Sequence, residues 1–179
     1  RFRASYGKLR LVKLDLRREI MAIQEGDRIP EATLHHMVDG KPTAVSTAEI
    51  FDGKKVVMFA VPGAFTPTCS MAHLPGYVVN ADAIKAKGVD SIVCLAVNDA
   101  FVMDAWGQAK NAEHLMMVGD GNGALTGAMG LEMDGSGFGM GSRSQRYAMI
   151  VEDGTVKKLA VEAPGKLEVS AAEAILESL

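Results

Sequence analysis

The sequence has only two cysteines, a small acidic excess and no long apolar run. Cys69 and Cys94 cannot build the disulfide network typical of small secreted proteins, and such sparse cysteine usage fits a reducing compartment. The net charge of −3 leaves no general basic surface for nucleic acid. No apolar segment approaches the roughly 20 residues that span a bilayer. We therefore expect neither a nucleic-acid nor a membrane partner.

The histidines are also few, and their spacing does not indicate a metal site. The four are scattered, without the regular separations of zinc ligands: His35, His36, His73 and His114. The glycine-rich segment 132–141 lacks the strand–glycine–helix context of a phosphate-binding loop, so we expect a flexible loop there.

The first twenty residues differ in charge from the remainder of the chain. They carry seven basic and two acidic side chains, which leaves the remainder at about −8. Met21 resembles an internal start, so we interpret residues 1–20 as an appended or upstream-translated extension outside the fold. A targeting peptide and a basic helix are the alternatives, although transit peptides avoid acidic residues. The folded domain is expected over residues 21–179.

Periodicity and turn residues predict alternating strands and helices in that domain. The expected strands cover 32–34, 43–45, 55–61, 89–97, 115–118, 146–151 and 156–161. The expected helices run from the Cys69 loop to about 86, over 100–109, within 121–130 and from 170 to 179. The S-x-x-E pattern of Ser170 and Glu173 predicts a capping box for the last helix. This order indicates an α/β sandwich with a mixed central sheet flanked by helices.

The most informative segment is the run PGAFTPTC, which ends at Cys69. It follows the apolar strand 55–61 and precedes a series of good helix formers. The unpaired N–H groups and the positive dipole end of a helix stabilise an anion, so Cys69 is placed where its thiolate is favoured. A buried, inert thiol is the alternative.

Three further residues are candidates for assisting this sulfur. Thr66 lies three residues before Cys69, a spacing that lets its hydroxyl face the sulfur in a turn entering a helix. Pro62, with Pro67, stiffens the loop and covers the thiol. A cation for developing negative charge must come from elsewhere, and Arg146 is the candidate.

The pattern P-x-x-x-T-x-x-C over residues 62–69 resembles the active-site motif of the peroxiredoxins. The longer run 61–77, the blocks 94–102 and 143–149, and the sequence VEDG at 151–154 resemble the type II, or peroxiredoxin-5, subfamily. The resemblance covers 23–179, which is the chain without its first residues.

The resemblance implies a thioredoxin-like fold and reduction of hydrogen peroxide or alkyl hydroperoxides. Cys69 matches the peroxidatic cysteine, which becomes a sulfenic acid. Thr66 matches the residue that hydrogen-bonds the thiolate and the peroxide, Pro62 the shielding proline, and Arg146 the arginine that activates the thiol and steadies the leaving oxygen. The four would also bind the substrate, and no metal ion or organic cofactor is implied.

The chain departs from many members of that subfamily by lacking a resolving cysteine before the last helix, where Ser170 stands. Cys94 lies within an apolar strand and is expected to be buried and inert. We therefore expect a one-cysteine mechanism with glutathione and glutaredoxin as reductant, and thioredoxin as the alternative. The resemblance also implies a homodimer, and we expect a cytoplasmic protein, or an organellar one if residues 1–20 are a transit peptide.

Two other functions remain open from the sequence. One is a redox sensor, in which oxidation of Cys69 is a signal without fast turnover; Thr66 and Arg146 favour turnover instead. The other is a cysteine hydrolase that pairs Cys69 with His73, which lies four residues later on the expected helix. We expect His73 to have a structural role.

Overall fold

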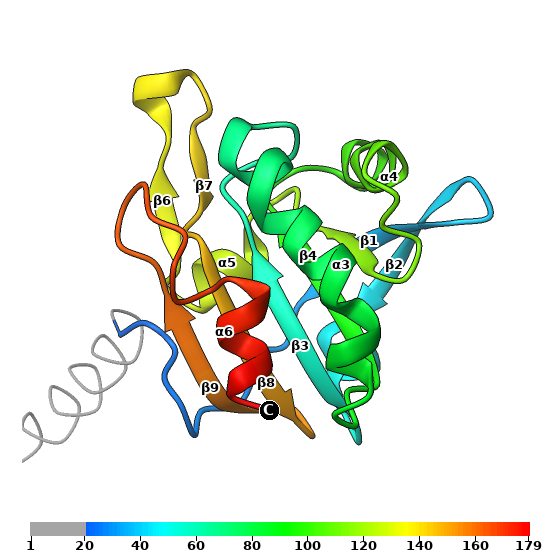
Figure 1. Cartoon of the computed structure of the whole chain (residues 1–179). Coiled ribbons are helices and arrows are strands. Elements are labelled where there is room, and N and C mark those ends of the chain that lie inside the picture. Colours follow the sequence, from blue (N-terminus) through cyan, green and yellow to red (C-terminus); the bar gives the residue numbers. More distant parts are fainter. Residues whose placement is uncertain (1–20) are drawn as a thin grey trace, which may run out of the picture.

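The computed structural model describes residues 21–179, in which one mixed sheet lies between two layers of helices (Figure 1). The sheet has seven strands in the order β2-β1-β5-β4-β3-β8-β9, and β6 and β7 pair separately. The strands are β1 (Thr33–Val38), β2 (Lys41–Ser46), β3 (Lys55–Ala60), β4 (Ser91–Ala96), β5 (Met116–Gly119), β6 (Glu132–Asp134), β7 (Ser142–Ser144), β8 (Tyr147–Glu152) and β9 (Thr155–Val161). The helices are α2 (Thr47–Phe51), η1 (Cys69–His73), α3 (Leu74–Lys85), α4 (Ala100–Ala109), α5 (Ala124–Ala128), η2 (Ser136–Phe138) and α6 (Ala172–Glu177). The extension expected over 1–20 lies outside the described residues.

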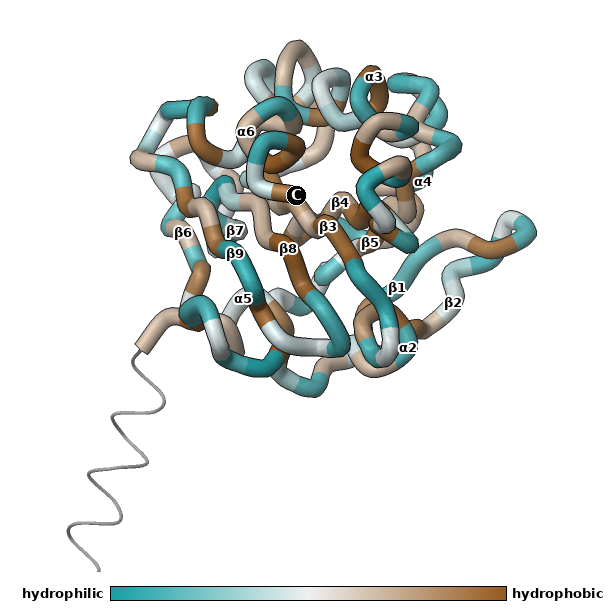
Figure 2. The backbone as a smooth tube through the Cα atoms, turned by 60° about the horizontal axis from the view of Figure 1, so that its bottom comes forward, coloured by the Kyte–Doolittle hydropathy of each residue, from teal (hydrophilic) through white to brown (hydrophobic). Residues whose placement is uncertain are grey.

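The core consists of two apolar layers, one on each face of the sheet. On one face α3, α4 and α6 pack over the strands through side chains such as Tyr77, Trp106 and Ile175. On the other face α2 and α5 contribute Phe51 and Leu125. Figure 2 shows hydrophobic residues concentrated in the body of the molecule along β3 and β8. Because both faces of these central strands are covered, they read in the sequence as continuous apolar runs.

The expected mixed α/β fold is confirmed. β3, β4 and β5 are parallel to one another, whereas β8 and β9, both expected as strands, form an antiparallel hairpin. The turn of that hairpin is Asp153-Gly154, and both residues have positive φ, which suits a tight two-residue connection. α4 spans Ala100–Ala109 as expected, and the side chain of Asp99 caps it by accepting from the amide of Val102 at 2.9 Å.

Two local expectations are wrong, and one helix was not expected. The segment 132–141 is not a simple loop, because β6 and β7 pair as an arm, with Glu132 opposite Ser144. The capping box belongs to Ser46 and Glu49 at the start of α2, a helix that we did not expect. Ser170 does not cap the last helix, because its hydroxyl donates to Glu162 at 2.9 Å and α6 begins after Ala171.

Candidate active site

Cys69 lies near the start of the helix that follows β3. After Ala60 the chain turns through residues 61–66 and becomes helical at Pro67, and Cys69 is the first residue of η1, which continues directly into α3. Its side chain is only 1% exposed. Cys69 therefore lies in the first turn of a helix, where unpaired amides give the backbone a partial positive charge.

The loop before Cys69 is held in shape by three short contacts. The amide of Ala64 donates to the side chain of Asn98 at 3.0 Å, and the hydroxyl of Thr66 donates to the carbonyl of Gly63 at 2.7 Å. Phe65 has a φ of 61°, a left-handed conformation that is uncommon for a bulky residue and that turns the chain sharply. Since the proton of Thr66 is used at Gly63, its oxygen can only accept a further hydrogen bond.

Two residues into this helix, η1 is a π-helical turn, in which the amide of Leu74 donates to the carbonyl of Cys69. Five residues therefore occupy this turn where an α-helix would place four, and such single turns are frequent at functional sites. The wider turn carries both Cys69 and His73, and both side chains are buried. The sequence predicted a helix here but not its widened turn.

Arg146 reaches the sulfur from the start of β8, the strand next to β3 in the sheet. Ala60 at the end of β3 pairs with Tyr147 at the start of β8, so the residue before Tyr147 stands next to the cysteine loop. The guanidinium Nη2 donates to Sγ of Cys69 at 3.2 Å, and Nη1 contacts Nδ1 of His73 at 3.0 Å. The structure thus brings Arg146 and Cys69 together, although 77 residues separate them.

Three further residues belong to the segments that carry Cys69 and Arg146. Pro62 is half-buried in the loop, and Pro67 is exposed. Arg143 donates from Nε to the carbonyl of Met140 at 2.8 Å, on the approach to β8.

His73 is buried and has both ring nitrogens occupied. Its Nε2 contacts the carbonyl oxygen of Ser170 at 3.0 Å, and its Nδ1 contacts Arg146. Burial, followed by the positive charge of Arg146, lowers the pKa of His73 to about 4, although the hydrogen bond to Ser170 opposes this shift. His73 is therefore neutral at neutral pH, and these partners do not include Cys69, as a hydrolase pair would require.

The low pKa of His73 predicts how its burial affects acid stability. The unfolded chain takes up this proton near 6.5, the native protein only near 4, so the free energy of unfolding falls as the pH drops from 6.5 to 4. The 2.5-unit difference corresponds to about 3 kcal/mol. Denaturant unfolding at pH 5 and pH 7 captures about 2 kcal/mol of this loss, because the remainder is lost only as the pH approaches 4, and the measured difference should shrink in His73→Asn. An equal pH dependence in that variant would contradict the assignment.

Cys94 occupies the interior expected for it, and Trp106 is buried as well. Cys94 is fully buried in β4, and burial raises the pKa of its thiol well above the usual value, so it is a poor nucleophile. Trp106 is also fully buried and donates from Nε1 to the hydroxyl of Ser70 at 2.9 Å. This bond ties α4 to the residue that follows Cys69.

Sequence reasoning missed two residues beside the site, Glu162 and Ser170. Oε1 of Glu162 accepts from the amide and the hydroxyl of Ser170 at 2.7 and 2.9 Å. It also accepts from the amide of Glu168 at 2.7 Å. Burial would raise the pKa of Glu162, but these hydrogen bonds hold it below its usual range. The sequence drew attention to Ser170 through its S-x-x-E pattern and as the position without a resolving cysteine, and neither indicated this role.

Residues 21–179 contain neither a metal-binding cluster nor a membrane-spanning helix. No three side chains of His, Cys, Asp or Glu in this part of the chain are grouped so that they could hold a metal ion. None of its helices is long and apolar enough to cross a membrane.

The comparisons with known proteins agree on one family. Residues 24–176 match the redoxin family. The chain is 47% identical to the rice protein peroxiredoxin-2E-2, chloroplastic, over 89% of this chain and 74% of that protein. It is 44% identical to peroxiredoxin-2C of Arabidopsis thaliana, over 88% of this chain and 98% of that protein.

Among solved structures, reduced Prx3 of Vibrio vulnificus in complex with H₂O₂ superposes with a TM-score of 0.85 and 58% identity. The match covers 87% of this chain and 98% of that one. The chain therefore belongs to the redoxin family, among the peroxiredoxins of the type II, peroxiredoxin-5-like class.

Proposed function

We propose that this chain is a thiol-dependent peroxidase that reduces hydrogen peroxide and alkyl hydroperoxides at Cys69. The observation that carries the proposal is the 3.2 Å contact between Nη2 of Arg146 and Sγ of Cys69 at a helix N-terminus. A guanidinium and a helix dipole together favour a thiolate, which is the nucleophilic form of cysteine. Membership of the peroxiredoxins gives this thiolate its substrate class.

In the proposed reaction the thiolate attacks the terminal oxygen of the hydroperoxide. A lone pair of sulfur forms the S–O bond, the O–O bond breaks, and the leaving oxygen departs with the electron pair and takes up a proton as alcohol or water. Arg146 stabilises the negative charge that develops on that oxygen. The product at Cys69 is a sulfenic acid.

Thr66 and Pro62 complete the proposed substrate site. The proton of the Thr66 hydroxyl is donated to Gly63, so the oxygen is free to accept the O–H of a hydroperoxide. Pro62 lacks an N–H, and as a half-buried ring it shields the sulfur from bulk water. A substrate held between Thr66 and Arg146 would present its terminal oxygen to Cys69.

We propose that glutathione with glutaredoxin regenerates the thiol, because no second cysteine is placed to do so. Glutathione would displace water from the sulfenic acid to give a mixed disulfide, and a second thiol would release the reduced enzyme and glutathione disulfide. Cys94 is fully buried in β4 and has a raised pKa, which argues against a resolving role.

Mass spectrometry after one equivalent of peroxide and excess glutathione tests this step. We expect one glutathione adduct, on the peptide that contains Cys69, and its removal by glutaredoxin. Cys94→Ala should retain both the adduct and turnover. A disulfide between Cys69 and Cys94, or turnover supported by thioredoxin alone, would refute the glutathione route without affecting the peroxidase proposal.

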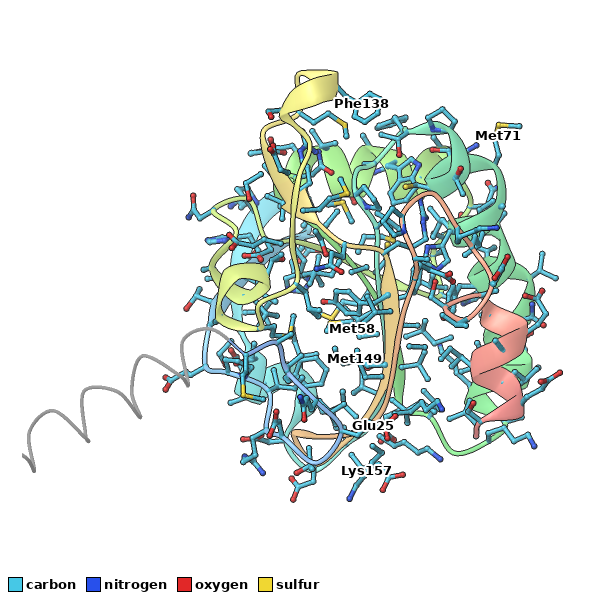
Figure 3. All side chains as sticks on the ribbon, turned by 90° about the vertical axis from the view of Figure 1, so that its left-hand side faces the viewer. Glu25, Met58, Met71, Phe138, Met149 and Lys157 are labelled. Carbon is cyan, nitrogen blue, oxygen red and sulfur yellow. The ribbon has the colours of Figure 1, made fainter. Side chains whose placement is uncertain are left out.

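We also propose that the protein forms a homodimer through the surface around the site. Three large apolar side chains are exposed there or close by: Phe65 at 56%, Met71 at 80% and Phe138 at 86%. Phe138 at the tip of the β6–β7 arm and Met71 on η1 lie at the same end of the molecule (Figure 3). Exposed apolar patches of this kind often mark protein interfaces. Light scattering should give twice the mass of the chain, and a monomer at micromolar concentration would contradict the proposal.

A further inference from the structure

The two ring nitrogens of His73 face groups of opposite character. Nδ1 lies 3.0 Å from Nη1 of Arg146, and a guanidinium can only donate. Nε2 lies 3.0 Å from the carbonyl oxygen of Ser170, which can only accept. These partners fix the tautomer, with the proton on Nε2 and a free lone pair on Nδ1 pointing at the arginine.

The imidazole ring has little freedom to leave this position. It is 1% exposed, and its centroid lies 5.0 Å from the ring of Phe59 and 5.7 Å from that of Tyr77. The carbonyl of Ser170 that receives its N–H is itself fixed, because Tyr77 donates to the same oxygen at 2.8 Å.

The segment that carries Ser170 is anchored in turn by a carboxylate. Oε1 of Glu162 accepts from the amide and hydroxyl of Ser170 and from the amide of Glu168. A continuous series of hydrogen bonds therefore runs from the segment between β9 and α6, through Ser170, His73 and Arg146, to the sulfur of Cys69.

A neutral acceptor at this position leaves the positive charge of Arg146 intact, whereas an acidic one would offset it. A carboxylate bound to Nη1 would orient Arg146 equally well, but it would also offset the positive charge that the sulfur and the leaving oxygen need. Neutral imidazole holds the guanidinium by one hydrogen bond and leaves its charge directed at Cys69. The burial that keeps His73 neutral is therefore part of the arrangement.

We propose that His73 is a positioning residue of this site, which orients Arg146 toward Cys69 through its unprotonated Nδ1 and is itself held by Ser170. The proposal rests on the peroxidase function inferred above, since it assigns how the cation of that reaction is kept in place. It gives the segment 162–170, remote from Cys69 in sequence, a role in setting the reactivity of the sulfur.

Two substitutions at the same position separate positioning from packing. Asparagine can place an amide oxygen near the site of Nδ1 and keep an acceptor for Arg146, whereas glutamine reaches toward Ser170 with an N–H but loses that acceptor. We expect His73→Gln to slow peroxide attack on the reduced enzyme by about tenfold, as for loss of one hydrogen bond to a charged group. His73→Asn should stay within about threefold of wild type, as a conservative replacement that keeps the bond. Equal losses in both variants would indicate packing alone and overturn the proposal.

A double-mutant cycle gives the decisive measurement. If His73 acts through Arg146, the tenfold effect of His73→Gln should largely disappear in an Arg146→Ala background. The same factor in both backgrounds would refute the proposal. The rate at which iodoacetamide alkylates Cys69 provides a second readout. Here too the effect of His73→Gln should largely disappear in the Arg146→Ala background. If the wild type alkylates readily but does not consume peroxide, the peroxidase function fails while the coupling of His73 to Arg146 is still measured.

Discussion

Replacing Cys69 by serine is expected to reduce peroxide consumption to the uncatalysed background while leaving the fold intact. A serine hydroxyl stays protonated at this position and cannot form the sulfenic acid on which turnover depends. The change is nearly isosteric, and the side chain it alters is only 1% exposed, so the packing around η1 should be preserved.

Peroxide consumption with glutathione and glutaredoxin measures this effect, and trapping of the sulfenic acid by a dione reagent identifies the sulfur that carries it. Cys94→Ala is the matched control, because it removes the other thiol of the chain from the interior of β4. Activity should survive in the control and vanish in Cys69→Ser. Residual turnover in Cys69→Ser, or its loss in the control, would assign the reaction to a different sulfur.

The features predicted correctly from the sequence are those that neighbouring residues determine. The strands 146–151 and 156–161 and the helix 100–109 were predicted from their own residues, and the turn Asp153-Gly154 and the cap Asp99 that bound them are equally local. The apolar run before Pro62 likewise defined β3 and placed Cys69 at the start of a helix.

The features that were missed depend on partners distant in the sequence. Two S-x-x-E patterns occur, at Ser46 and at Ser170, and only the first forms a capping box. The second fails because Glu162 engages Ser170, and nothing local reveals that competition. The contact of His73 with Arg146 spans 73 residues and requires β8 to pair with β3. Pattern reading singled out Cys69 as the candidate sulfur, but tertiary structure decides what surrounds it.

Replacing Arg146 by alanine is expected to slow the attack of Cys69 on peroxide by more than tenfold. The guanidinium donates to Sγ at 3.2 Å and is available to the departing oxygen. Hydrogen bonds to charged groups contribute about 1.5–3 kcal/mol, which corresponds to roughly 10- to 100-fold in rate. The second-order rate constant of the reduced enzyme with hydrogen peroxide, measured by stopped flow, isolates this step from regeneration.

Two further variants separate the charge of Arg146 from its shape. Arg146→Lys keeps the charge but replaces a planar fork with a single ammonium, which is poorly suited to hold His73 and Cys69 at once. We expect its rate to fall between those of wild type and Arg146→Ala.

Arg143→Ala removes an equal charge whose Nε is bound to Met140, and its effect should be smaller than that of Arg146→Ala. A larger effect of Arg143→Ala would identify Arg143 as the stabilising cation. A wild-type rate in Arg146→Ala would show that the contact with the sulfur does not contribute to the reaction.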